Sequence, residues 1–271
     1  MKQAFFLCCF FLCSYKIQSQ ELFVYTEPAS NMAAKSIGFR LTNSLMKETG
    51  NAKYDYYLSP EIMWGLSKKV MIHAEGFFSN RKNDFKAEGA ALYLKYRFYS
   101  VDAVHNHFRM AAFVRGAYNN SNIHQPSIDL NGHNSGYEAG LVATKLINKL
   151  ALSGTGSFLY ATDNGSGNKF QYDDKNLNAV GYTLSAGRLM LPKAYTDYKQ
   201  TNLNAMLEFL GQTNLKSGKT YFDMAPSLQF IFLSKMRLDI GYRFAIVNDL
   251  LRDSKNGFLV RFEYNIFSAY K

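Results

Sequence analysis

Residues 257–267, GFLVRFEYNIF, lie near the end of the chain and decide how the rest of it is interpreted. Successive side chains of an extended strand point to opposite faces. One face of this stretch is apolar and largely aromatic, with Phe258, Val260, Phe262, Tyr264 and Ile266. The opposite face is polar, with Arg261, Glu263 and Asn265. Soluble sheets alternate in the same way, so this stretch alone does not distinguish a strand in water from one in lipid.

Residues 236–247, MRLDIGYRFAIV, repeat the pattern just before it. Its apolar face carries Met236, Leu238, Ile240, Tyr242, Phe244 and Ile246. The opposite face carries Arg237, Asp239 and Arg243, and burying these charges in a dry core would require a full set of partners. A membrane barrel reverses the arrangement, because its apolar face contacts lipid and its polar face lines the lumen. We therefore predict an all-β fold, a closed antiparallel transmembrane β-barrel of about 12 strands.

The chain begins with Met1-Lys2 and the apolar run AFFLCCFFLCSY. This order is typical of a secretory signal peptide, and the run is shorter than the roughly 20 apolar residues of a membrane helix. We predict that residues 1–19 are removed. The net charge then falls from +10 to +8, because Lys2 and Lys16 are lost. Export gives this basic chain little access to nucleic acid, so we expect no nucleic-acid partner.

All three cysteines, Cys8, Cys9 and Cys13, lie inside the predicted signal peptide. The mature chain would contain none, which excludes disulfides and thiolate metal sites. A lipoprotein signal is an alternative, but leucine rather than a small residue precedes both Cys8 and Cys13.

Alternating apolar and polar residues, separated by turn residues, continue from position 36 to the end of the chain. We predict strands at 36–46, 53–66, 70–78, 89–98, 108–118, 136–146, 150–161, 177–188, 201–210, 220–233, 236–247 and 257–267. Each is close to the length of about 9–11 residues that a tilted strand needs to cross a bilayer. Short and long connections largely alternate, which is typical of outer-membrane barrels with short periplasmic turns and longer outer loops.

Some connections and two prolines depart from that pattern. We predict a polar loop at 79–88 and unusually long periplasmic connections at 99–107 and 191–199. Pro60 and Pro226 fall inside predicted strands, where proline removes a ladder hydrogen bond. We expect a bulge or a local break at each.

The predicted domains are the signal peptide at 1–19, an N-terminal arm at 20–35 and the barrel at 36–271. Pro28 interrupts the arm, which lies either in the periplasm or in the barrel mouth, where it would occlude the lumen. Its aromatic residues Phe23 and Tyr25 would occlude the lumen, bind an apolar solute or pack against the barrel floor.

The inward faces of the strands supply the candidate site residues. The predicted lumen-lining residues are Arg40, Asp55, Glu61, Glu75, Lys95, Arg97, Arg109, Arg115, Glu138, Glu208, Asp223, Arg237, Asp239, Arg243, Arg261 and Glu263. Acids and bases are equally frequent among them, so the lumen is nearly neutral and the surplus positive charge belongs to loops and turns.

Two interpretations of these charges remain open. The second and third strands carry acids and the fourth and fifth carry bases, which could form opposed charged walls of a selective channel. Alternatively, acids on the third strand pair with bases on the fourth, and the network fills the barrel. A barrel of 12 strands lies between filled barrels of about 8 and open ones of about 16, so size does not decide.

Two segments, 189–211 (LMLPKAYTDYKQTNLNAMLEFLG) and 21–41 (ELFVYTEPASNMAAKSIGFRL), resemble those of a known group. They are similar to small Gram-negative outer-membrane barrels assigned to transport. That group is linked to phenol-degradation pathways and resembles the fatty-acid and aromatic-hydrocarbon channels. The resemblance implies a monomeric barrel and passive uptake of a small molecule. It supplies no site motif, and the chain lacks the long N-terminal plug of the fatty-acid channels.

Two further candidates are an enzyme and a metal site. His133 and Ser135 match the His-x-Ser pair of a twelve-stranded outer-membrane phospholipase, with Asn148 as the third residue. However, the pair and Asn148 fall at opposite ends of the barrel, whereas such residues must be in hydrogen-bond contact. His105 and His107 lack a third metal ligand nearby. We therefore predict no enzyme activity, no cofactor and no metal.

The sequence thus predicts a barrel of the bacterial outer membrane that acts as a passive channel or transporter for an unidentified small molecule. A closed structural or surface-binding barrel that acts through its extracellular loops is the alternative. The expected partners are the lipid bilayer, lipopolysaccharide bound by basic loops, the barrel-assembly machinery during insertion and a small solute.

Overall fold

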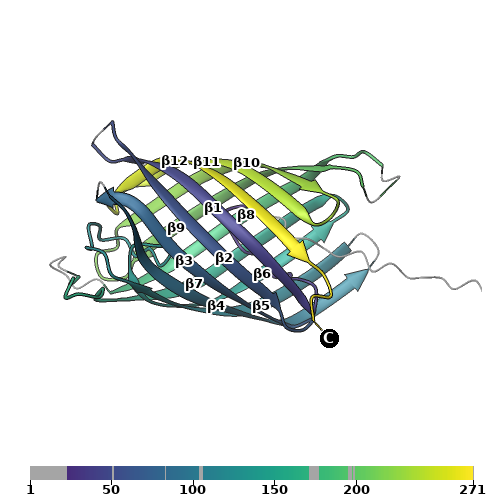
Figure 1. Cartoon of the computed structure of the whole chain (residues 1–271), viewed down its shortest axis with the longest axis horizontal. Helices are drawn as coiled ribbons and strands as arrows, with labels where there is room; N and C mark the ends of the chain where they lie inside the picture. The colour runs from purple at the N-terminus through teal and green to yellow at the C-terminus, as the bar shows by residue number, and fades with distance from the viewer. Residues whose placement is uncertain are drawn as a thin grey trace, which may run out of the picture.

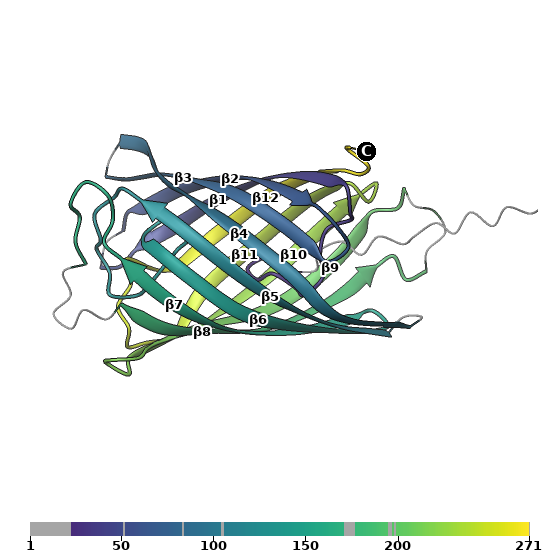
Figure 2. The same cartoon turned by 90° about the horizontal axis from the view of Figure 1, so that it is seen from below.

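A computed structural model describes residues 23–50, 52–82, 84–103, 106–170, 177–194, 197 and 199–270. In these ranges, antiparallel strands form one closed barrel (Figures 1 and 2). The predicted all-β, 12-stranded closed barrel is therefore confirmed. The predicted signal peptide lies outside the described residues. Within the described part of the chain, no helix is long and apolar enough to span a membrane.

Every strand pairs with its neighbours in the sequence, and the last strand closes on the first. The strands are β1 (Ser36–Glu48), β2 (Tyr54–Gly65), β3 (Val70–Lys82), β4 (Asp84–Ala103), β5 (Asn106–Asn119), β6 (Ser135–Ile147), β7 (Leu150–Thr162), β8 (Asn178–Leu191), β9 (Asn202–Asn214), β10 (Thr220–Phe232), β11 (Met236–Asn248) and β12 (Ser254–Ile266). At the closure, Arg40 of β1 lies opposite Glu263 of β12.

Two predicted connections are wrong, because the structure continues the strands through them. Residues 79–82 belong to β3 and 84–88 to β4, and the ladder extends to the pair Lys82 and Asp84. Likewise, β4 and β5 remain paired as far as Ala103 and Asn106. Pairing satisfies the backbone groups of both segments. Alternation of hydrophobicity could not reveal this pairing, because residues 79–88 are mostly polar and a bulge between Arg97 and Tyr99 interrupts the alternation in β4. β4 is 20 residues long as a result.

The outward side chains form an apolar belt. Leu184 is 63 % exposed and Phe262 is 53 % exposed, whereas the inward-facing Asp239 is fully buried. This inside-out arrangement is that of a transmembrane barrel. A strand such as β1, with 13 residues, is about 43 Å long at about 3.3 Å per residue. At a tilt of about 40° it spans about 33 Å, which exceeds the roughly 25 Å of an apolar belt.

Pro60 and Pro226 are accommodated by local breaks without a bulge. Pro60 pairs with Leu41 of β1, but the ladder from β2 to β3 is interrupted at this position. Pro226 pairs with Leu207 of β9, and the ladder from β10 to β11 is interrupted in the same way. The register on the two sides of each break is unchanged. Each proline therefore turns its missing N–H toward one neighbour only.

The apolar belt predicts that a charged side chain on the outward face lowers the free energy of unfolding by an amount that depends on its depth in the bilayer. Leu41 lies in the middle of the outward face of β1, and Ile37 lies at its edge. Leu41→Arg should destabilise the barrel by about 2–4 kcal/mol, and Ile37→Arg by about 0–1 kcal/mol. Urea unfolding in lipid vesicles measures both. Equal costs at the two positions would contradict the placement of the belt.

Candidate functional site: the interior of the barrel

The two ends of the barrel differ. We call the end with the connections at 66–69, 148–149 and 233–235 the turn end, and the opposite end the loop end. The C-terminus lies at the turn end (Figure 1). The described part of the arm, residues 23–35, runs from inside the barrel to the start of β1 at the turn end (Figure 2).

One carboxylate holds the first part of the arm. Glu208 of β9 is fully buried. It accepts hydrogen bonds from the backbone N–H groups of Val24, Tyr25 and Thr26, each at 2.9 Å. The Thr26 hydroxyl donates a fourth at 2.8 Å. Backbone groups without a sheet partner must be satisfied in some other way, and Glu208 supplies three of these partners here.

Ion pairs hold the next part of the arm. Glu27 pairs with Arg40 at 3.0 Å and with Lys95 at 3.4 Å. The Lys95 ammonium also donates to the Pro28 carbonyl at 2.7 Å. The Ala29 N–H donates to the Thr144 hydroxyl at 2.9 Å. The arm is thereby bound to β1, β4 and β6 as well as to β9.

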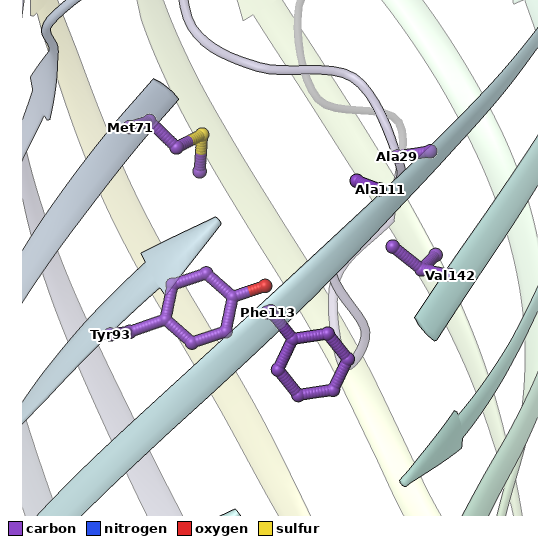
Figure 3. Packing of buried hydrophobic residues seen from close by; sticks show 6 residues of the cluster. All are labelled: Ala29, Met71, Tyr93, Ala111, Phe113 and Val142. Atoms are coloured by element: carbon purple, nitrogen blue, oxygen red, sulfur yellow. The ribbon is translucent and has the colours of Figure 1, made fainter. Parts of the chain in front are cut away.

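Apolar contacts complete the binding of the arm. Phe23 and Val24 pack in a buried cluster with side chains of β7, β9 and β12. Ala29 packs in a second cluster on β3–β6, with Met71, Tyr93, Ala111, Phe113 and Val142 (Figure 3).

The backbone of β11 leaves space for the Tyr25 ring. A Cβ placed on Gly241 would lie 2.7 Å from the nearest carbon of that ring. Gly241 therefore forms the notch in which this part of the arm lies.

An ionic network lines the turn end. Arg40 pairs with Glu263 at 2.9 Å and with Glu61 at 3.0 Å. Arg237 pairs with Asp239 at 3.0 Å and with Glu263 at 3.1 Å. Each charge thus has an opposite partner, as buried charges require.

The loop between β5 and β6, residues 120–134, folds into the loop end. Its Ile128 exchanges two hydrogen bonds with the Gln212 side chain of β9, at 2.9 and 2.7 Å. Ile128 and Leu130 belong to a buried cluster with residues of β7 and β8. The loop therefore covers the mouth of the barrel from β5 across to β9.

Asn164, in the loop between β7 and β8, holds the 120–134 loop in place. Its amide nitrogen donates to the carbonyls of Ser121 at 2.8 Å and His133 at 2.9 Å. Its oxygen accepts the Ser135 N–H at 2.7 Å. One side chain thus joins the start and the end of the 120–134 loop.

The 120–134 loop also contacts the opposite wall. His133 pairs with Asp129 at 3.0 Å and lies 3.3 Å from the Tyr57 hydroxyl of β2. Burial alone raises the pKa of the Asp129 carboxyl. The adjacent His133 and the Asn131 N–H outweigh this and hold that pKa well below its usual range. Because 36 % of the Asp129 side chain is exposed, solvent screens part of this attraction.

Two arginines share one carboxylate below the loop. Asp223 of β10 is fully buried and pairs with Arg243 at 2.6 Å and with Arg252 at 2.5 Å. The Arg252 guanidinium lies 4.0 Å from the centroid of the Tyr221 ring, within the range of a cation–π contact.

Between the arm and the 120–134 loop lies a band of inward-facing side chains that are partly exposed. We call it the middle band. It contains Glu75, Arg115, Glu138, Arg243, Arg261, Thr155, Ser157 and Thr183. Inward residues at the levels of the arm and of the loop, such as Glu208 and Gln212, are instead buried. The middle band is therefore the polar surface that the interior offers to water or to a solute.

The predicted lumen-lining residues fall into groups. Arg40, Glu61, Lys95, Glu208, Arg237, Asp239 and Glu263 are buried around the arm, and Asp223 is buried below the loop. Glu75, Arg115, Glu138, Arg243 and Arg261 lie in the middle band. Arg97 and Arg109 lie near the turn end, where they donate to the Lys68 carbonyl and the Ser30 hydroxyl. Asp55 is buried near the loop end, 3.4 Å from Lys53.

Of the two interpretations left open by the sequence, the pairing of acids on the third strand with bases on the fourth is wrong for Glu75 and Lys95. The ladder places Ala91 opposite Glu75, and Lys95 opposite Met71. Glu75 instead pairs with Arg115 of β5 at 3.6 Å. The acidic and basic strands are also neighbours around the wall rather than opposed.

Sequence reasoning missed several interior residues. Glu27 is one, because nothing in the arm shows where it lies. Arg81 and Glu88 pair at 3.1 Å, but both belong to the segment predicted as a loop. Arg252 follows the last residue of β11 and returns into the mouth, which alternation along a strand cannot show.

The residues of the enzyme and metal candidates have different partners. The Ser135 hydroxyl accepts the Asn119 N–H at 2.8 Å, while His133 contacts Asp129 and Tyr57. Asn148 lies in a turn at the opposite end of the barrel. His105 is outside the described residues. Among those that are described, no three His, Cys, Asp or Glu residues gather as metal ligands.

Comparison with known proteins shows which solved structures have a similar fold. No protein-family model and no curated protein matches the sequence. An outer-membrane channel from Pseudomonas putida F1 is similar in structure, with a TM-score of 0.59 and 12 % identity over 90 % of this chain and 100 % of that one. The NanC porin is similar with a TM-score of 0.51 and 10 % identity, over 84 % of this chain and 98 % of the porin. The chain thus has the fold of outer-membrane channel barrels.

The hydrogen bonds of Glu208 lead to a prediction about amide exchange in the arm. Glu208→Ala removes the acceptor of three arm N–H groups. A hydrogen bond to a charged group contributes about 1.5–3 kcal/mol, so exchange of the Val24, Tyr25 and Thr26 amides should become about 10- to 100-fold faster. Hydrogen exchange detected by mass spectrometry measures this. Asp55→Ala is the matched control, because Asp55 is also buried, lies near the loop end and has no hydrogen bond to the arm among the described residues.

The 120–134 loop should loosen in acid. A carboxyl whose pKa is lowered by folding stabilises the folded loop above its unfolded pKa, which is about 3.9 for Asp. That contribution is lost as the pH falls below this value toward the lower folded pKa. The protection of the loop amides, measured as their exchange rate relative to the intrinsic rate at each pH, should therefore fall below about pH 4. An Asp129→Asn variant that keeps the same acid dependence would contradict this.

Proposed function

We propose that the protein is a passive outer-membrane channel for a small solute, with a lumen narrowed by the arm and the 120–134 loop. The turn end faces the periplasm in this proposal. The observation that carries it is that the barrel closes through β1 and β12, while the arm is a separate segment held mainly by side-chain contacts. The arm can therefore move without opening the ladder.

The interior charges also support a channel. Replacing buried ion pairs by apolar side chains is often neutral or stabilising, so stability alone does not account for an interior this rich in charge. Arg243 and Arg115 keep 25 % and 16 % of their side chains exposed in the middle band. Charged side chains around a constriction set the selectivity of pores. The two similar folds are themselves named as a channel and a porin.

The class of solute is part of the proposal. The segments at 189–211 and 21–41 resemble barrels linked to phenol-degradation pathways, which favours a small aromatic molecule. The aromatic rings of Tyr25, Tyr57 and Tyr93 face the interior beside the charged groups and could contact such a ring.

A closed barrel that acts through its loops is the second candidate. The clamp formed by Asn164 across the 120–134 loop favours it, because the loop end is covered by specific hydrogen bonds.

Single-channel recording in planar bilayers tests the channel. Two unrelated substitutions should displace the arm: Glu208→Ala removes its acceptor, and Gly241→Val fills the notch of Tyr25. We expect small conductance steps for the wild type and a several-fold larger conductance for both variants, because the arm occupies the cross-section.

Asp55→Ala is the control that leaves the arm in place, because Asp55 lies near the loop end and away from the arm. Heat-modifiable migration on gels shows that each variant has folded. Folded variants that remain silent would reject the channel in favour of the closed barrel. A conductance that rises equally in the control would show that the arm does not determine the width of the lumen.

A further inference from the structure

The turn end carries a large excess of exposed and partly exposed basic side chains. Besides Arg97 and Arg109, they include Lys145, Lys149, Arg188, Lys193, Lys199 and Lys235. Among the described residues at this end, the exposed acids are Asp102 and Asp197, and the partly exposed Glu27 is paired with Arg40 and Lys95 inside the barrel. Asp102 is already paired with Arg109 at 2.9 Å. The surplus positive charge of the chain is therefore concentrated here.

Two of these bases point outward from the barrel wall. Lys145 of β6 lies opposite Phe108 and Leu152, and Arg188 of β8 lies opposite Leu150. Directly opposite residues of a ladder share a face. Leu150 and Leu152 are exposed members of the apolar belt, so Lys145 and Arg188 point to the same side as the belt.

Lys149 orders the connection beside them. Its ammonium donates to the carbonyls of Pro192 at 3.0 Å and Lys193 at 2.6 Å. The Leu189 N–H donates to the Lys149 carbonyl at 3.0 Å. These bonds bring the start of the connection after β8 against the turn between β6 and β7. Lys145, Lys149, Arg188 and Lys193 thus form one surface over β6–β8, which we call the basic patch.

The position of the basic patch along the barrel wall determines which part of the bilayer surrounds it. A Lys or Arg on the outward face of a barrel is costly in the middle of the bilayer and nearly free at its edge. Lys145 lies close to Ile147, where β6 ends, and Arg188 lies close to Leu191, where β8 ends. Both strands end at the turn end, so both bases are displaced from the centre of the belt. They therefore lie toward the turn-end edge of the belt, close to the level of the lipid headgroups. Exposed Leu141 and Leu184 lie on the side of the bilayer centre, and Lys149 and Lys193 lie on the side of the turns.

We propose that the basic patch binds the phosphate groups of anionic phospholipids in the leaflet at the turn end. A phosphate between Lys145 and Arg188 would place its acyl chains along outward leucines nearer the bilayer centre, Leu141 of β6 and Leu184 of β8. A soluble anion gains nothing from these leucines, whereas a lipid contacts both parts of the surface. Basic side chains close to a membrane surface attract anionic lipids in this way.

Native mass spectrometry of the full barrel, equilibrated with a mixture of phosphatidylglycerol and phosphatidylcholine, tests the proposal. The double substitution Lys145→Gln/Arg188→Gln should lower the preference for phosphatidylglycerol on the order of tenfold. The charge-conserving Lys145→Arg/Arg188→Lys should retain it. The matched control Lys86→Gln/Lys219→Gln removes two exposed bases at the loop end and should leave the preference unchanged.

Several results would overturn the proposal. These are an unchanged preference in the folded double variant, an equal loss in the loop-end control, and displacement of phosphatidylglycerol by inorganic phosphate at similar concentrations. If the double variant does not fold, Arg188→Gln alone provides the comparison. The measurement requires no conductance, so its failure is distinct from failure of the proposed channel.

Discussion

Closure of the ladder between β1 and β12 is the constraint on which the rest of the structure depends. In lipid, every backbone N–H and C=O must find a partner within the protein, and a closed barrel leaves no free edge. The pairs from Ile37 with Ile266 to Glu48 with Ser254 complete this ring. Outside it, apolar side chains can face acyl chains. Inside it, charges such as Asp239 are enclosed and paired with neighbours instead of facing a hydrocarbon core.

A segment that enters the closed barrel cannot join the ladder, so its backbone N–H and C=O groups need partners other than a strand. Side chains are the partners of the arm: Glu208 accepts three of its N–H groups, and Arg261 donates to its Val24 carbonyl. The 120–134 loop uses Gln212 and Asn164 in the same way. Polar side chains of the barrel wall and of a neighbouring loop thus serve as partners for two inserted segments, and the charges of the middle band are left between them.

Alternation along the chain was sufficient to predict the fold, because an inward Arg237 next to an outward Leu238 is costly wherever the interior is an apolar core. It also identified Glu208 and Arg40 as inward residues. It could not predict that Glu208 binds the arm or that Arg40 binds Glu27, because those contacts join segments that the pattern does not relate. The extension of β3 to Lys82 was equally hidden, since the residues of that hairpin are mostly polar and do not alternate. The extension of β4 to Ala103 was hidden by the bulge between Arg97 and Tyr99, which interrupts the alternation.

The contacts of the arm have a consequence for the order of assembly. Its partners include Arg40 on the first strand and Arg261 on the last, and these two strands become neighbours only when the cylinder is sealed. The complete set of contacts that holds the arm therefore does not exist while the sheet is still open. Complete seating of the arm thus requires the final seam. A chain that lacks its last strand would keep the contacts of the arm with Glu208 and Lys95 but would lose the contact with Arg261.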